Sequence, residues 1–128
     1  MKLLLDTCCF LWLALEPGKI SKAASQAFDD PANARLMSDA SILEIILKYS
    51  KGKLPLPGEP RAWLPDRLAF FRIQPLPISH DSIFRSGELP RVHNDPFDRL
   101  LAAQSIEESM IILSPDEPLS LLGASRIW

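Results

Sequence analysis

Three carboxylates follow short apolar runs, an arrangement that suits a metal ion. Asp6 follows KLLL, Asp39 follows ARLMS, and Asp116 comes shortly after MIIL. In a parallel sheet the carboxyl ends of the strands share one edge, where open α/β folds place their ligands. Crowded carboxylates repel one another, and oxygen ligands without His or Cys suit Mg²⁺ or Mn²⁺. The pattern therefore predicts metal-assisted hydrolysis of a phosphodiester bond.

A second pair of acids, Asp95 and Asp98, precedes an apolar helical run in HNDPFDRLLAAQ, residues 93 to 104. Asp95 is expected to accept a hydrogen bond from a free backbone N–H, and Pro96 suits the first helical position. Asp98 in the first turn favours the positive end of the helix. Capping alone explains both acids, so this pattern leaves a further role for Asp98 in an active site open.

Helical patterns separate the expected strands along the chain. Strands are expected at 2–6, 34–38 and 110–114, with weaker candidates at 72–78, which holds two prolines, and at 125–128. Helices are expected from the end of the first strand through Leu13 and at 21–30, 39–53, 79–89 and 95–109. The proline-rich stretch 54–60 is expected to be a rigid connector. Alternating strands and helices predict right-handed crossovers and a mostly parallel sheet.

Length and composition indicate one ordinary globular domain, residues 1–128. The chain is 47% hydrophobic and 23% charged with a net charge of -2, so charge alone suggests no partner. Its apolar runs are far shorter than the roughly 20 residues of a membrane span, and the start lacks a signal-peptide layout, so a cytoplasmic protein is expected. Cys8 and Cys9 are adjacent, which disfavours a disulfide, and neither has a metal-site spacing. Both are expected to be reduced, small hydrophobes.

Five segments spread over nearly the whole chain carry a resemblance to a known family. They are LLLDT, SILEIILK, GKLPLP, DPFDRLLAAQ and ILSPDEPL, in this order. Together they resemble the VapC-type toxins of the PIN-domain ribonuclease family. The resemblance implies a three-layer α/β/α fold with a central, mostly parallel sheet flanked by helices. It also implies the metal-binding acids, which are Asp6, Glu44 and Asp98, with Asp116 as a fourth and Thr7 beside the first.

The same resemblance implies the activity and the partners. It implies a toxin of a type II toxin–antitoxin system that cleaves RNA with Mg²⁺ or Mn²⁺ through a metal-activated water. A cognate antitoxin that blocks the site and a homodimer are implied as well. Cys8 stands where related sequences often carry His, and Leu43 where they often carry Trp, but neither position is a ligand in the family pattern. Asp39 stands where a small residue is commoner, so it is not assigned as a ligand.

Periodicity alone gives a different prediction for Glu44. It lies opposite the apolar stripe of its helix, and Lys48, four residues on, is a natural ion-pair partner. The stripe consists of Ile42, Ile45, Ile46 and Tyr49. On this interpretation Glu44 is a surface residue. Asp6 as a plain helix cap and Asp116 as the start of a turn are open alternatives of the same kind.

Other function classes fit less well. A phosphorylation-receiver domain needs a lysine at a late strand end, yet no Lys follows Lys53, and no GxxxxGK indicates a P-loop enzyme. His80 and His93 are expected on the surface, away from any nucleophile. Basic residues are expected to contact phosphates or solvent, namely Lys48, Lys51, Lys53, Arg91 and Arg99. The alternative function that stays open is a catalytically inactive PIN-fold module that only binds a protein partner.

Overall fold

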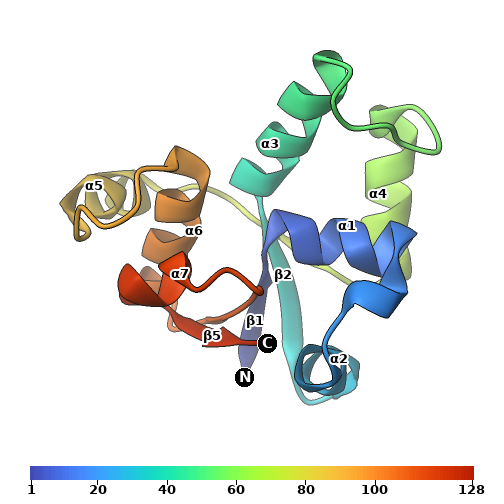
Figure 1. Cartoon of the computed structure of the whole chain (residues 1–128). Coiled ribbons are helices and arrows are strands. Elements are labelled where there is room, and N and C mark those ends of the chain that lie inside the picture. The colour runs from blue at the N-terminus through green and yellow to red at the C-terminus, as the bar shows by residue number, and fades with distance from the viewer.

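A five-stranded parallel sheet forms the centre of the computed structural model, which describes all 128 residues. Figure 1 shows the helices arranged around β1 and β2. The strand order is β3-β2-β1-β4-β5, and every neighbouring pair runs parallel. The strands are β1 Lys2–Leu5, β2 Ala34–Ser38, β3 Gln74–Leu76, β4 Ile111–Leu113 and β5 Ser125–Ile127. The expected strands therefore all exist, including the two weaker candidates.

Seven helices and one 3-10 turn connect the strands. They are α1 Thr7–Leu15, η1 Pro17–Lys19, α2 Lys22–Asp29, α3 Asp39–Ser50, α4 Pro60–Phe70, α5 His80–Glu88, α6 Pro96–Glu107 and α7 Pro118–Leu121. Helices α4 and α7 were not predicted. The α4 segment was not predicted as a helix because its two prolines, Pro60 and Pro65, resemble connector residues. Pro60 is tolerated at the first helical position, where a missing N–H is harmless, and Pro65 lies inside the helix. None of the helices combines the length and the apolar character that crossing a membrane requires.

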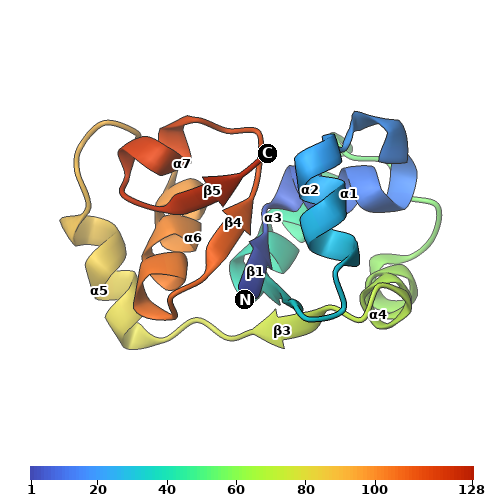
Figure 2. The same ribbon diagram turned by 90° about the horizontal axis from the view of Figure 1, so that it is seen from below.

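The side chains of β1 alternate between two helical layers, which makes the fold three layers thick. Leu4 belongs to a buried cluster with Leu101 of α6 and Leu119 of α7. Leu3 and Leu5 belong to a second cluster, on the opposite face of the sheet, with residues of α1 to α4, namely Phe10, Phe28, Ile45 and Leu64. Figure 2 shows the two layers on either side of β1, with α5, α6 and α7 together on one side. The three-layer α/β/α prediction is confirmed.

The position of β3 in the sheet explains why this strand tolerates Pro75. It lies at the edge of the sheet, where Pro75 pairs with Met37 of β2. Only one side of an edge strand takes part in the ladder, so a residue without an N–H fits there. The doubt that prolines cast on 72–78 as a strand is resolved by this edge position.

The order of the strands reverses beside β1. The chain runs outward from β1 through β2 to β3 and then places β4 on the other side of β1. Open α/β sheets bind ligands at such a reversal, at the carboxyl ends of the strands. Asp6 directly follows β1, and its backbone N–H donates to the Leu113 carbonyl of β4 at 3.1 Å. The first acid of the sequence pattern therefore stands at the reversal point.

A buried polar contact ties the start of α3 to α6. Ser38 caps α3 by accepting from the Ala40 N–H at 3.0 Å, and its hydroxyl donates to the side-chain oxygen of Gln104. The side-chain nitrogen of Gln104 donates to the Pro77 carbonyl at 3.2 Å. Ser38 and Gln104 are both buried. This contact fixes α3 beside α6.

Replacing Gln104 with Leu is expected to lower the free energy of unfolding by about 1–3 kcal/mol, because it leaves buried polar groups without partners. Urea unfolding of both proteins measures this difference. The matched control is Gln26→Leu on α2, where the side chain is exposed, and a change within about 0.5 kcal/mol is expected there. Equal effects of the two substitutions would show that the buried contact contributes nothing to stability.

Candidate active site

A cavity of about 250 Å³ lies at the carboxyl end of β1, and acidic side chains dominate its wall. The lining residues are Asp6, Thr7, Cys8, Leu11, Glu44, Lys48, Asp95, Asp98 and Asp116. The structure thus brings together all four acids singled out in the sequence. Asp39 is absent from this cavity and lines an apolar groove between α3 and α4 instead. We call this space the acid cavity.

Asp6 is the most buried of the four acids. Its side chain caps α1, with Oδ1 accepting from the Thr7 N–H at 2.7 Å and Oδ2 accepting from the Ser114 hydroxyl at 2.6 Å. Burial, together with the charges of Asp98 and Asp116, raises the pKa of Asp6 to about 6, although the hydrogen bond from Ser114 opposes the rise. Asp6 is therefore a helix cap and also the centre of a repulsive group of carboxylates.

Asp98 reaches the acid cavity from the first turn of α6. Asp95 caps this helix as expected, because its Oδ1 accepts from the N–H groups of Phe97 at 2.9 Å and Asp98 at 3.2 Å. The Oδ2 atom of Asp98 lies 2.7 Å from Nε2 of His93. Burial raises the pKa of Asp98, and the contact with His93 opposes this shift. The expectation that His93 lies on the surface was wrong, because its half-buried ring touches a site carboxylate.

Glu44 faces the acid cavity from α3. Its side chain is only 16% exposed, and Lys48 pairs with it at 3.0 Å. The helix contacts α1 and α6 as well as the sheet, so the side opposite the apolar stripe borders the cavity instead of open solvent. Periodicity alone therefore placed Glu44 wrongly. The stripe itself is also less buried than expected, since Ile46 is 37% exposed.

Asp116 joins the cavity through Ser114 at the end of β4. The Ser114 hydroxyl accepts from the Asp116 N–H at 3.0 Å while donating to Asp6. Ser114 was not predicted from the sequence, although its place at the end of a strand beside β1 is the signal that would have found it. Oxygen atoms of Asp6 and Asp116 and the sulfur of Cys8 lie within 4.8 Å of one another.

Cys8 lies in the site, contrary to its expected role as a plain small hydrophobe. Its Sγ lies 3.5 Å from the Asp6 Oδ2, to which it donates. Burial and the neighbouring carboxylates raise the pKa of this thiol, so it stays protonated. A protonated thiol is a poor nucleophile, and Cys8 therefore does not turn the acid cavity into a covalent active site.

The donor set of the acid cavity fits a small divalent cation. Carboxylate oxygens from four separate segments face one space, which matches the preference of Mg²⁺ and Mn²⁺ for oxygen ligands. The Thr7 hydroxyl is buried beside Asp6 and has no hydrogen-bond partner. An unsatisfied buried hydroxyl and mutually repelling carboxylates are both states that a cation with bound waters relieves.

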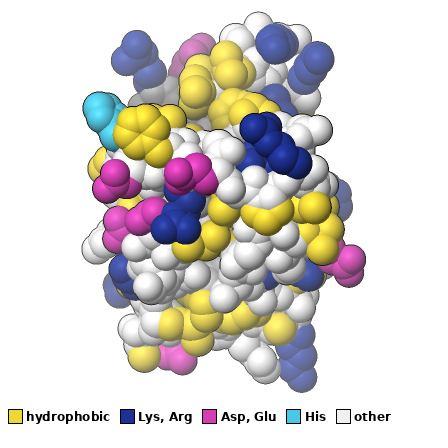
Figure 3. Space-filling view, turned by 90° about the vertical axis from the view of Figure 1, so that its left-hand side faces the viewer, with side chains coloured by type: hydrophobic (Ala, Val, Ile, Leu, Met, Phe, Trp, Pro, Cys, Tyr) yellow, Lys and Arg dark blue, Asp and Glu magenta, His cyan; other side chains and the backbone are white.

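Arg99 does not serve as a phosphate contact. It is buried, and its guanidinium donates to backbone carbonyls between Ser86 and His93. The expectation that it contacts phosphates or solvent was therefore wrong. Lys51, Lys53 and Arg91 are exposed as expected. On the face drawn in Figure 3, acidic, basic and apolar side chains are interspersed, without a broad region of one charge.

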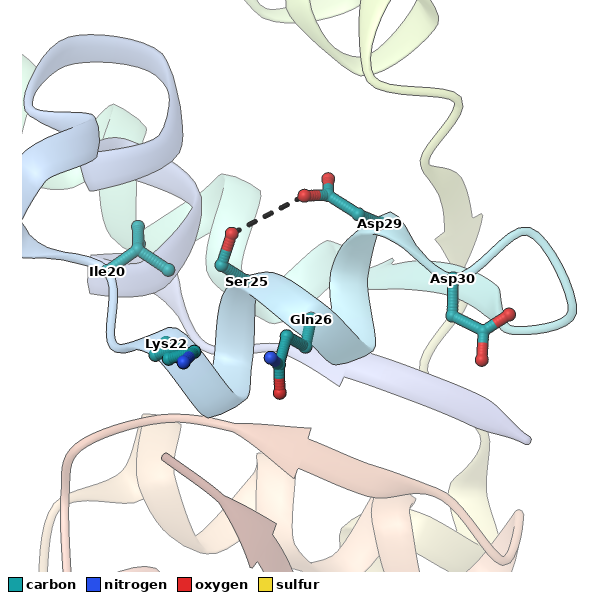
Figure 4. A pocket seen from close by; sticks show the side chains of 6 residues that line it. All are labelled: Ile20, Lys22, Ser25, Gln26, Asp29 and Asp30. Atoms are coloured by element: carbon teal, nitrogen blue, oxygen red, sulfur yellow. Dashed lines mark hydrogen bonds between the residues drawn. The ribbon is translucent and has the colours of Figure 1, made fainter.

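A larger cavity, of about 660 Å³, lies along α2 and offers no comparable chemistry. Its polar side chains do not converge on one point, and Ser25 donates to Asp29 at 3.4 Å (Figure 4). The residues that line it are Ile20, Lys22, Ser25, Gln26, Asp29 and Asp30. The acid cavity is smaller but holds the convergent titratable groups, so it is the candidate active site.

Residues 3–123 match the sequence model of the PIN domain family. The chain belongs to the PIN domain family. No curated protein matches the sequence significantly. The family assignment agrees with the resemblance drawn from the five sequence segments, and the match spans all four acids of this PIN domain.

Solved structures of toxin–antitoxin complexes share the fold of this PIN domain. A chain of VapBC2 from Rickettsia felis, bound to a DNA fragment from the promoter, is 16% identical with a TM-score of 0.71, covering 99% of this chain and 98% of that chain. A chain of VapBC-1 from nontypeable Haemophilus influenzae is 15% identical with a TM-score of 0.69, covering 99% and 97%. A chain of VapBC-5 from Mycobacterium tuberculosis is 16% identical with a TM-score of 0.60, covering 98% and 95%.

Without metal, the raised pKa of Asp6 should make the protein less stable as pH rises. Between the ordinary value of 3.8 and about 6, the unfolded chain has lost the Asp6 proton while the folded protein keeps it. The free energy of unfolding should therefore fall across this window by about 3 kcal/mol from Asp6 alone, and the loss persists at higher pH. Asp98 adds a contribution of the same sign.

This contribution is measured by chemical unfolding in chelator from pH 4 to pH 7. It equals the difference between the pH profiles of the parent and of Asp6→Asn. Asn keeps a capping oxygen but does not titrate. Asp81→Asn, at an exposed carboxylate of α5, is the control and should leave the profile of the parent unchanged. A parent and an Asp6→Asn variant with parallel profiles would contradict the account of a destabilised, buried Asp6.

Proposed function

We propose that this PIN domain protein is a VapC-type toxin, an endoribonuclease that cleaves RNA with the help of Mg²⁺ or Mn²⁺. The observation that carries the proposal is the convergence of Asp6, Glu44, Asp98 and Asp116 in one cavity at the reversal point of the sheet. These acids come from four separate parts of the chain, and their mutual repulsion has no structural benefit. A fold that still gathers them is best explained by a bound cation.

The four acids are proposed as the metal ligands. Asp6 is fixed by the Thr7 N–H and the Ser114 hydroxyl, which leave its remaining lone pairs for a cation. Asp98 reaches in from α6 and Glu44 from α3, so ligands approach from different directions. When bound, a divalent cation would supply Lewis-acid activation of the scissile phosphate and of a water molecule.

The chain supplies orientation and charge rather than a covalent nucleophile. The thiol of Cys8 stays protonated beside Asp6, and the buried Thr7 hydroxyl has no hydrogen-bond partner that could take its proton. Lys48 is half-exposed, and its ammonium pairs with Glu44 at 3.0 Å. The exposed Lys51, Lys53 and Arg91 are proposed to attract the phosphates of the RNA backbone. Because the net charge of the chain is -2, this attraction must come from local positive groups.

A cognate antitoxin is the proposed protein partner. The similar chains of known structure come from toxin–antitoxin complexes. A guanidinium pairs bidentately with carboxylates, so an arginine of the antitoxin is the side chain best suited to occupy the acid cavity and exclude the cation. A homodimer of this chain is proposed with it, as the resemblance implies.

The direct test of the function is RNA cleavage in cells. Expression of the chain alone in a bacterial host, followed by sequencing of RNA 5′ ends, should reveal new ends at defined positions. The Asp6→Asn variant should produce none of them. New ends that appear equally with Asp6→Asn would contradict the proposed active site. The absence of new ends with the parent would favour the inactive protein-binding module.

Glu44 gives the sharpest test in vitro, because its two interpretations predict opposite results. As a metal ligand, Glu44→Gln removes a negative oxygen, so RNA cleavage should collapse at low Mg²⁺ and recover in part at high Mg²⁺ or with Mn²⁺. As a mere ion-pair partner of Lys48, it should cost only about 0.2–0.5 kcal/mol of stability and leave cleavage intact.

The matched control is Lys48→Gln, which breaks the same ion pair from the other side. The measurement is cleavage of a defined RNA across a Mg²⁺ titration. Lys48→Gln should keep most of the cleavage activity, whereas Glu44→Gln should lose most of it. Near-parental cleavage by both variants over the whole titration would remove Glu44 from the ligand set.

A further inference from the structure

His93 contacts the carboxylate of Asp98 from outside α6. It lies in the segment between α5 and α6, and its Nε2 is 2.7 Å from the Asp98 Oδ2. The two side chains are 27% and 18% exposed, so the contact is largely shielded from water. His93 is also the only side chain that hydrogen-bonds this carboxylate, whereas Asp6 receives donors on both oxygens.

The backbone of His93 is held in place by Arg99, the residue after Asp98. The Nη1 atom of Arg99 donates to the His93 carbonyl at 2.9 Å and to the Pro90 carbonyl at 2.8 Å. Its Nε donates to the Ser86 carbonyl at 3.0 Å, and its Nη2 to the Leu89 carbonyl at 2.8 Å. A buried guanidinium with four backbone acceptors leaves this segment little freedom. Arg99 therefore fixes the position from which the imidazole reaches Asp98.

We propose that His93 is a positioning residue of the acid cavity, which holds one oxygen of Asp98 so that the other is presented to a divalent cation. This inference rests on the proposed function. In the tautomer with its proton on Nε2, the ring donates to Oδ2 and leaves Oδ1 free. Asp95 and Asp116 are like charges that act on Asp98, and without the donor we expect this repulsion to turn the carboxylate away from the cavity.

Hydrogen bonds to metal-ligating groups are known to orient the ligands and to strengthen metal binding. This site has the same arrangement. Asp98, the candidate ligand, lies in the first turn of α6, His93 is its single side-chain donor, and the buried Arg99 holds the backbone of His93. A purely structural role for His93 would stabilise the fold with or without metal. A positioning role affects the affinity for the cation.

The test compares Mn²⁺ binding, measured by electron paramagnetic resonance of free Mn²⁺, in the parent, His93→Phe and His93→Gln. Phe keeps a ring without a donor, whereas the Gln amide keeps a donor. His93→Phe should weaken Mn²⁺ binding by about 10–100-fold, and His93→Gln should recover most of the affinity. His80→Phe, the same change at the exposed histidine of α5, is the control and should bind Mn²⁺ as the parent does.

Melting in chelator separates positioning from folding. A positioning role predicts nearly equal metal-free melting temperatures for the parent and His93→Phe. Should the Phe ring disturb the fold, His93→Ala removes the same donor without adding bulk and should show the same loss of affinity. Parental Mn²⁺ affinity in His93→Phe or His93→Ala would overturn the inference while leaving the proposed function in place. A parent that binds no Mn²⁺ would overturn both.

Discussion

Repulsion among carboxylates at the end of β1 is the constraint around which this molecule is built. Asp6 is buried there, and burial together with the charges of Asp98 and Asp116 raises its pKa to about 6. Such a group opposes folding whenever it is ionised and uncompensated. The surrounding fold must therefore supply the stability and the rigidity that keep the acids together, and a cation that neutralises them couples binding to stability.

Different local devices bring the acids to this one place. Asp6 and Asp116 are joined through the Ser114 hydroxyl, which bridges the ends of the adjacent strands β1 and β4. Asp98 is placed by the capped start of α6 and by His93. Glu44 is placed by α3, whose capping Ser38 is bound to the buried Gln104 of α6. The cavity thus depends on the register of strands and helices that are far apart in sequence.

The sequence predicted the parallel sheet and its helical layers because apolar runs and helical periods alternate regularly. The helix α4 escaped prediction because Pro60 and Pro65 looked like connector residues. Asp6 and Asp116 were predicted as site residues from their positions at the ends of strands. Glu44 was predicted only through the family resemblance, because helical periodicity assumes that the side opposite an apolar stripe faces solvent. The contact between His93 and Asp98 was not predictable, because it depends on the path of a loop that Arg99 fixes from inside the protein.

Anomalous diffraction from crystals soaked in Mn²⁺ tests the central claim most directly, because it locates the cation without relying on activity. The account predicts an anomalous peak inside the acid cavity, within coordination distance of carboxylate oxygens of Asp6 and Asp98. Crystals of Asp6→Asn, soaked in the same way, should lack the peak. Two results would contradict the claim that these acids form a metal site. One is a cavity without a peak at a Mn²⁺ concentration that saturates any binding seen in solution, and the other is a peak only elsewhere on the protein.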